Sequence, residues 1–270
     1  MATTGGSRPA SILAHQRIGR GRRPLVLLHG FLGSARNLAT LARGLAARRG
    51  ELDVVAFDLT GHGASPPLPP APDTATLATD VLASAGALGL AWPLTLAGHS
   101  LGGRVALRAA QLEPAAVSGV TLLDVGPGPL EGGDGIAPVL DAVLRAPDIF
   151  ASRGEARAAL LTAGLAPGLA DWMLLNLEAS GDQHRWRVDR RALAALHARI
   201  AREDLWPVVE GPRAWTLRCI RGSASPYVNE PDARRLQAAG CPVVTIEGAG
   251  HFVHAERPRE VLDAVAEGLG

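Results

Sequence analysis

PLTLAGHSLGGRVAL, residues 93–107, holds the features that decide the fold. Its first half is a short apolar run typical of a β-strand, and a helical pattern opens at Leu101. Between them lies GHSLG, a G-x-S-x-G pattern centred on Ser100. A serine on such a strand-to-helix turn is exposed for attack, and small residues at Gly98 and Gly102 let strand and helix approach. We expect a nucleophile here, the alternative being a structural serine in a glycine-rich turn.

Apolar runs of the same kind recur along the chain and alternate with helical patterns. Strands are predicted at 24–30, 53–59, 93–100, 117–125, 216–222 and 242–248, with a further antiparallel edge strand in SILAHQRIG (11–19). Helices are predicted at 35–48, 74–88, 101–113, 230–239 and 259–268. Uninterrupted apolar strands are typical of a sheet covered on both faces. The sequence therefore predicts an α/β protein with a doubly wound, mostly parallel sheet.

Residues 128–205 break this alternation, because they contain helical patterns but no convincing strand. We interpret the segment as a helical cap inserted between the sixth and seventh strands of the sheet. Ligands of open α/β sheets bind beside the carboxyl ends of the strands, where such a cap would shape a pocket. The expected organisation is a core of residues 1–127 and 206–270, with residues 128–205 as the inserted cap.

Composition narrows the possible partners. The net charge is +1, from 27 Lys and Arg against 26 Asp and Glu, and no basic run suggests nucleic acid as a partner. The chain has neither an 18-residue apolar run nor a hydrophobic signal core, so we expect a soluble, cytoplasmic protein without a membrane partner. Cys219 and Cys241 show no metal-ligand spacing and are expected to be buried. Nothing in the sequence indicates an oligomeric state.

Two further motifs supply groups that a serine nucleophile needs. HGFLGS (29–34) follows the first clear strand, and its Phe31 N–H, with the Leu101 N–H, would form an oxyanion hole. GAGH (248–251) follows the last strand, so His251 is the expected general base. His29 is interpreted as a structural histidine that bonds the backbone of its loop.

The acid that orients the histidine has to come from an unusual place. Many α/β-hydrolases carry it after the strand that follows the cap, but RGSASPYV (221–228) has Ser225 there and no carboxylate. Asp124, in VTLLDVGP, ends the strand before the cap and can accept from the histidine Nδ1–H. Asp58 also ends a strand, and we expect it to bond the following turn.

Together these motifs resemble the α/β-hydrolase superfamily, and more narrowly the YbfF-type bacterial carboxylesterases and their mitochondrial relatives. The resemblance runs from about residue 22 to the C-terminus and is weakest across the cap. Its most specific part is an acid in LLDVGP combined with an RGSASPYV that lacks Asp. It implies a triad of Ser100, Asp124 and His251 and a carboxylesterase-type serine hydrolase. Such an enzyme cleaves short-chain acyl esters or thioesters through an acyl-enzyme.

The expected substrate is a small-molecule ester, and the chemistry needs neither a metal nor an organic cofactor. Two alternatives stay open. One is the cleavage of a C–C bond or a lactone by the same triad. The other is a ligand-binding protein that kept the fold and lost catalysis.

Overall fold

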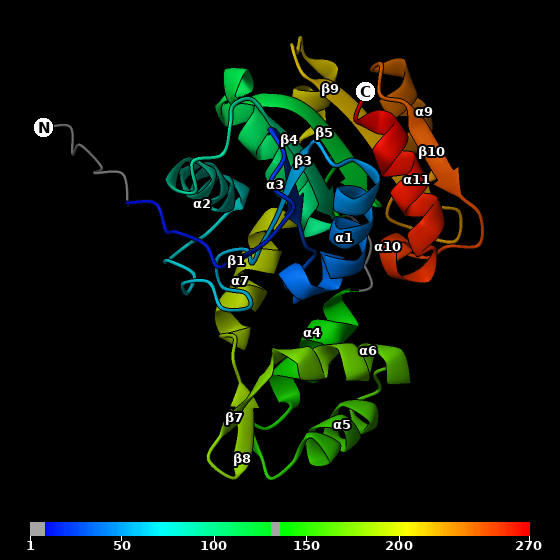
Figure 1. The fold of residues 1–270 in the computed structure, drawn as a ribbon. Helices are drawn as coiled ribbons and strands as arrows, with labels where there is room; N and C mark the ends of the chain where they lie inside the picture. The colour runs from blue at the N-terminus through cyan, green and yellow to red at the C-terminus, as the bar shows by residue number, and fades with distance from the viewer. Residues whose placement is uncertain (1–8, 131–135) are drawn as a thin grey trace, which may run out of the picture.

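The structure is a computed structural model that describes residues 9–130 and 136–270, which build a sheet with helices on both faces (Figure 1). Seven strands form it in the order β1-β3-β2-β4-β5-β9-β10. β1 pairs antiparallel with β3, and the other neighbours are parallel. The strands are β1 (His15–Ile18), β2 (Arg23–Leu28), β3 (Leu52–Phe57), β4 (Leu94–His99), β5 (Val117–Leu123), β9 (Thr216–Gly222) and β10 (Val243–Ile246). The predicted sheet and its antiparallel edge strand are confirmed.

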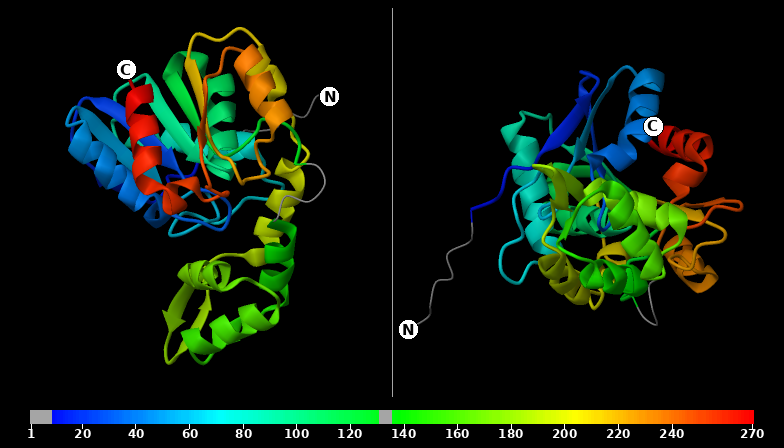
Figure 2. Two further views of the ribbon diagram at one scale, coloured as in Figure 1. Left: turned by 90° about the vertical axis from the view of Figure 1, so that its right-hand side faces the viewer. Right: turned by 90° about the horizontal axis from the view of Figure 1, so that it is seen from below.

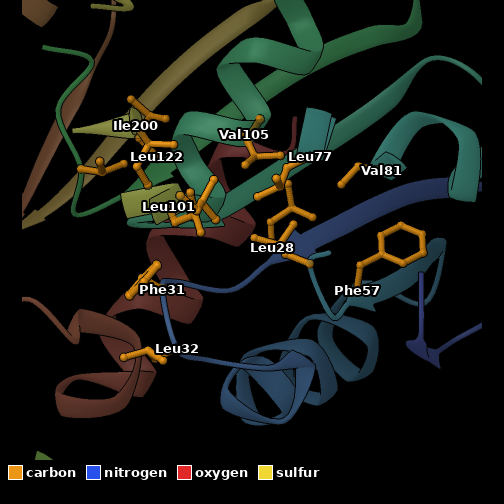
Figure 3. Packing of buried hydrophobic residues seen from close by; sticks show 14 of the residues in the cluster. Leu28, Phe31, Leu32, Phe57, Leu77, Val81, Leu101, Val105, Leu122 and Ile200 are labelled. Atoms are coloured by element: carbon orange, nitrogen blue, oxygen red, sulfur yellow. The ribbon is translucent and has the colours of Figure 1, made fainter. Parts of the chain in front are cut away.

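Alternate residues of each strand enter two different hydrophobic cores, which explains the uninterrupted apolar runs. In β2, Val26 and Leu28 belong to the core beneath α2 and α3, whereas Leu25 and Leu27 belong to the core beneath α1 and α11. Figure 3 shows Leu28 and Leu122 packed with Leu77, Val81 and Val105 of the first core. The core helices are α1 (Ala39–Arg48), α2 (Thr74–Ala87), α3 (Leu101–Leu112), α8 (Trp206–Glu210), α9 (Glu230–Ala238), α10 (Val253–Glu256) and α11 (Pro258–Gly268).

The inserted segment leaves the sheet after β5 and returns at β9. Within the described residues these are the fifth and sixth strands of the sheet, so the expected position between the sixth and seventh strands is wrong by one. The strands predicted before the insertion also number five, so the error lies in the numbering of the strands and not in a missing strand. Figure 2 shows the segment as a lobe at one end of the sheet, built on α4 (Ile136–Arg145), α5 (Arg153–Thr162), α6 (Pro167–Met173) and α7 (Arg190–Ile200). Residues 1–8 and 131–135 of the expected core and cap lie outside the described residues.

The inserted segment, called the cap below, is not purely helical as expected. It contains an antiparallel sheet in the order β6-β8-β7, from β6 (Ile149–Phe150), β7 (Leu177–Ser180) and β8 (Gln183–Trp186). These strands have two to four residues, and each contains a single buried residue, so they lack an apolar run long enough to predict a strand. The hairpin turns at Gly181, whose φ of +61° suits glycine.

The two connections between cap and core lie side by side. Leu130 N–H donates to the carbonyl of Ala201 at 2.8 Å, and Leu205 N–H donates to the carbonyl of Pro127, also at 2.8 Å. The chain therefore enters and leaves the cap through a single hydrogen-bonded neck, which we define as residues 126–130 and 200–205.

Arg104, on α3, ties this neck to the core. Its side chain is 1% exposed and donates to the carbonyls of Gly126 (3.2 Å) and Gly128 (2.7 Å) on the entering chain. It also donates to the carbonyls of Ile200 (3.2 Å) and Glu203 on the leaving chain. Burial lowers the pKa of Arg104 to about 10, so the group stays charged at neutral pH. One buried cation thus holds both ends of the cap.

Arg104→Met should lower the free energy of unfolding by about 2–4 kcal/mol, because the carbonyls of the neck lose a charged donor inside the protein. Urea unfolding followed by circular dichroism measures this. Arg108→Met is the matched control, one turn later on the same helix. Arg108 also reaches Glu203 (3.2 Å), but it is more exposed, and a loss of only about 1 kcal/mol is expected. Equal losses for both variants would contradict the special role of Arg104.

Both cysteines lie in the environment that the sequence predicted. Cys219 and Cys241 are both buried and unpaired, as expected, and burial raises the pKa of each thiol. Within residues 9–130 and 136–270, no helix is long and apolar enough to cross a membrane. The same part of the chain contains no group of three His, Cys, Asp or Glu side chains that could hold a metal ion.

Candidate active site

Ser100 sits on the turn between β4 and α3 in a strained backbone conformation, with φ +51° and ψ −117°. Its N–H donates to the carbonyl of Leu123 in the neighbouring strand at 3.1 Å. A Cβ on Gly98 would lie 2.2 Å from the backbone of Gly102, and a Cβ on Gly102 would lie 2.2 Å from the carbonyl oxygen of Leu28. The predicted strand-turn-helix context and the need for two small residues are therefore confirmed.

Asp124 and His251 come together at the carboxyl ends of the strands. Asp124 directly follows β5 and is fully buried, and its Oδ2 lies 2.8 Å from His251 Nδ1. Because an ionised carboxylate only accepts hydrogen bonds, Nδ1 carries the proton and Nε2 is left to act as a base. The N–H of Gly222 holds the other oxygen, Oδ1, at 2.9 Å. The carboxylate is thus fixed from two sides.

Ser225 and Tyr227 support this pair, and the sequence interpretation missed both roles. Ser225 Oγ donates to Asp124 Oδ2, the oxygen that also accepts from His251. The ring of Tyr227 stacks on the imidazole of His251, with centroids 3.7 Å apart and planes at 17°. Ser225 has no carboxylate, but its hydroxyl binds the carboxylate of Asp124. The sequence did contain a sign of the role of Ser225, because this serine occupies the position in RGSASPYV where many α/β-hydrolases carry the acid.

Ser225→Ala should lower kcat/KM for ester hydrolysis about 10- to 100-fold, because a buried carboxylate loses a charge-assisted hydrogen bond and becomes less firmly held. Steady-state kinetics on p-nitrophenyl butyrate would measure the loss. Ser223→Ala, in the same loop, serves as the control because Ser223 Oγ accepts from the N–H of Gly248 and does not contact Asp124. Activity in Ser225→Ala equal to that of this control would show that the hydroxyl is dispensable.

Phe31 and Leu101, whose N–H groups are the expected oxyanion donors, lie with Ser100 around one small space. Phe31, Ser100 and Leu101 line a cavity of about 20 Å³ that Tyr227 also borders. Leu101 opens α3, where N–H groups have no carbonyl in a preceding turn to bond. Figure 3 shows Phe31 and Leu101 in the same cluster of packed side chains. The arrangement leaves room for a group as small as a carbonyl oxygen beside the serine.

The structure does not join Ser100 to His251 directly. Within residues 9–130 and 136–270, Ser100 Oγ has no hydrogen-bond partner. Tyr227 connects the two places, since it stacks on His251 and borders the cavity of Ser100. Catalytic hydrogen bonds of unliganded enzymes are often long and tighten when substrate binds.

Asp58 and His29 have the structural roles that the sequence predicted. Asp58 Oδ2 accepts from the N–H of Ala64 at 2.8 Å, within the turn after β3. His29 Nδ1 donates to the carbonyl of its neighbour Gly30 at 2.7 Å, and its Nε2 accepts from the N–H of Leu59 at 2.9 Å. Both side chains are therefore engaged in holding loops in place.

Acid should weaken the fold through two buried histidines of this region. Burial lowers the pKa of His29 to about 4 and of His62 to about 3, below the ordinary value of 6.5. As the pH falls below 6.5, each of these histidines takes up a proton in the unfolded chain but stays neutral in the folded protein. The free energy of unfolding therefore decreases until the pH approaches the lowered pKa of the folded state. Each histidine should lower the free energy of unfolding by about 2–3 kcal/mol by roughly pH 4.5, as measured by urea unfolding. His62→Asn should flatten this pH dependence, and an unchanged slope would exclude His62 as a contributor.

A larger cavity of about 470 Å³ opens between core and cap. Gly30, His99 and Phe252 line its core side, while Leu169 and Trp172 of α6 line its cap side. The Trp172 and Phe252 rings meet edge to face, with centroids 5.0 Å apart. Gly30 links this cavity to Ser100, because it lines the cavity and a Cβ placed on it would lie 3.3 Å from Ser100 Cβ. A mostly apolar cavity of this size suits a small organic ligand.

The fold and this geometry match a known family. Residues 25–264 match the family model described as the alpha/beta hydrolase family. The chain belongs to the alpha/beta hydrolase family, as the motifs had suggested.

Several relatives narrow the comparison. The chain is 30% identical to the esterase YbfF of Escherichia coli over 254 residues, which cover 90% of this chain and 91% of the relative. It is also 30% identical to the sn-1-specific diacylglycerol lipase ABHD11 of Mus musculus, over 91% of this chain and 80% of that one. Among solved structures, a marine microorganism esterase superposes with a TM-score of 0.84 at 21% identity, covering 96% of this chain and 99% of the other.

Proposed function

We infer that this protein is a serine esterase that cleaves carboxylic esters through a triad of Ser100, His251 and Asp124. The observation that carries the proposal is the hydrogen bond of 2.8 Å between the buried Asp124 carboxylate and His251 Nδ1. It lies at the same edge of the sheet as a serine held in a strained turn. The names of the relatives, an esterase and a lipase, support hydrolysis of esters.

The proposed reaction begins with the transfer of the Ser100 proton to His251 Nε2. Ser100 Oγ then attacks the ester carbonyl, and the N–H groups of Phe31 and Leu101 stabilise the negative oxygen. His251 returns the proton to the leaving alcohol, which leaves an acyl-enzyme. Water, activated by the same histidine, releases the acid. Asp124 keeps the proton on Nδ1 and stabilises the imidazolium that forms in each step.

The surroundings of Ser100 favour a small ester as substrate. The cavity at the serine is narrow, about 20 Å³, whereas the space beneath α6 is about 470 Å³ and mostly apolar. Because the smaller cavity has room only for a group such as the carbonyl oxygen, the acyl and alcohol parts of the ester have to share the larger apolar space, which limits the size of the ester. Esters and thioesters of short-chain acids are therefore the substrate class that we propose.

A fluorophosphonate probe tests the proposal, because it reacts with an activated serine whatever the natural substrate is. Ser100 should be labelled in a one-to-one ratio, seen as a mass shift on the peptide that contains GHSLG. A panel of p-nitrophenyl esters from acetate to decanoate should then show hydrolysis that is fastest for short chains. A protein that is neither labelled nor active on any ester of the panel would be a binding protein rather than an esterase.

A further inference from the structure

Two histidines in the wall of the larger cavity have no role in the proposed reaction. His99 and His254 are 3% and 7% exposed, and both line the space of about 470 Å³ beside Ser100. Their rings meet edge to face with centroids 4.5 Å apart. Polar groups buried in an otherwise apolar cavity are costly unless they find hydrogen-bond partners. Such a pair therefore needs an explanation.

The hydrogen bonding of His99 determines which of its nitrogens is free. Nε2 lies 2.8 Å from the carbonyl oxygen of His251, which can only accept, so Nε2 carries the proton. Burial lowers the pKa of His99 well below its ordinary value, and the ring is neutral. Nδ1 is therefore a bare acceptor, without a partner in the described part of the chain. Gly30, which lines the same cavity, lies beside both this nitrogen and Ser100, because a Cβ on Gly30 would lie 2.6 Å from Nδ1 and 3.3 Å from Ser100 Cβ.

His254 supplies the complementary group. Its Nδ1 is buried and has no hydrogen-bond partner among the described residues. Burial, with a smaller effect of His251, lowers the pKa of His254 to about 4, so this ring is neutral as well. A neutral imidazole carries one N–H group. With this N–H on Nε2, the buried Nδ1 has only a lone pair, and no N–H is left there without an acceptor. The ring then presents an N–H donor from a residue that lines the same cavity.

We propose that His99 and His254 form a hydroxyl-binding subsite, and that the substrate is an ester with a hydroxyl group within a few bonds of its carbonyl carbon. A hydroxyl donates one hydrogen bond and accepts others, which matches an acceptor at His99 Nδ1 and a donor at His254. A charged group would be buried without an opposite charge, and an alkyl group would leave Nδ1 unsatisfied. The proposal rests on the proposed esterase function and adds the class of ester.

Pairs of esters that differ in a single hydroxyl test the subsite. 2-Hydroxyethyl butyrate and propyl butyrate place the hydroxyl or a methyl in the alcohol part. Methyl 3-hydroxybutyrate and methyl 3-methylbutanoate do the same in the acyl part. The hydroxylated ester should have the higher kcat/KM in one of the pairs, by about tenfold, and that pair identifies the part of the substrate that reaches the subsite. Equal values within both pairs would overturn the proposal.

Variants assign the preference to the two histidines. His99→Phe and His254→Phe each keep an aromatic ring and remove both ring nitrogens. Each variant should therefore bring the kcat/KM ratio of the ester pair that the wild-type protein distinguishes close to one. The ratio cancels general losses of activity, including any loss from the missing bond between His99 and the carbonyl of His251. Leu169→Ala is the control, since it alters the apolar wall of the cavity and should leave the ratio unchanged. A ratio that persists in both phenylalanine variants would overturn the assignment.

Failure of this proposal and failure of the esterase function give different results. A protein that the fluorophosphonate probe labels at Ser100, and that hydrolyses both members of each pair equally, is an esterase without a hydroxyl subsite. A protein that is neither labelled nor active on any of the four esters would refute both.

Discussion

Ser100→Ala should abolish esterase activity, with kcat on p-nitrophenyl butyrate lowered by roughly 10⁴- to 10⁶-fold. Loss of a serine nucleophile has effects of this size in serine hydrolases, because the remaining groups act only as a unit. The substitution removes one oxygen and keeps the Cβ, so the strained backbone, with φ +51°, carries no new cost. The free energy of unfolding should therefore change by no more than about 0.5 kcal/mol.

Ser118→Ala provides the matched control for this experiment. Ser118 lies in β5 at the opposite end of the strand from Asp124, and its hydroxyl donates to the carbonyl of Leu94. This variant should keep full activity and full fluorophosphonate labelling of Ser100. Hydrolysis by Ser100→Ala at the rate of the Ser118 variant would place the nucleophile elsewhere in the chain.

Asp124→Asn should lower kcat by about 10⁴-fold while the fold stays intact. The amide would turn an N–H toward His251 Nδ1 and favour the tautomer that has its proton on the wrong nitrogen. Asparagine tolerates a left-handed backbone, and the φ of +54° at this position should be accommodated without strain. Steady-state kinetics, with urea unfolding to confirm folding, would measure the effect.

Asp58→Asn separates the role of Asp124 from that of any carboxylate at a strand end. Asp58 accepts from the N–H groups of Ala35 (2.7 Å) and Ala64 (2.8 Å), and it holds loops rather than the histidine. Activity should fall less than tenfold in this variant. A larger loss in Asp58→Asn than in Asp124→Asn would reverse the assignment of the acid.

Local patterns predicted the sheet because each strand is covered on both faces. The expected strand at 216–222 coincides with β9, and the expected helix at 74–88 differs from α2 by one residue. The strands of the cap escaped prediction, since β6 has only two residues and the outer residues of β8 are polar and exposed. Sequence periodicity reports burial, and these strands bury too little to produce it.

The residues of the candidate site could be predicted where the local sequence around each of them indicates its role. Asp124 ends a strand, and His251 follows one, so both could be named and the structure brings them together. The roles of Ser225 and Tyr227 depend on contacts with residues far away along the chain, such as the bond between Ser225 and Asp124 across 101 positions. No local pattern specifies such a partner, and a serine or tyrosine in a loop has many possible uses.

The single neck that joins cap and core makes the cap a transplantable part. Leu130 pairs with Ala201, and Leu205 pairs with Pro127, so the two cut points of a graft are already neighbours. A foreign cap whose ends meet in the same way could be spliced in without stretching the sheet, since insertions are tolerated where the ends lie close together. The residues of the proposed triad and oxyanion hole all come from segments outside the graft, whereas Leu169 and Trp172 of the larger cavity come from within it. We therefore expect an exchanged cap to replace part of the lining of the larger cavity, while His99, His254 and the proposed triad stay in place.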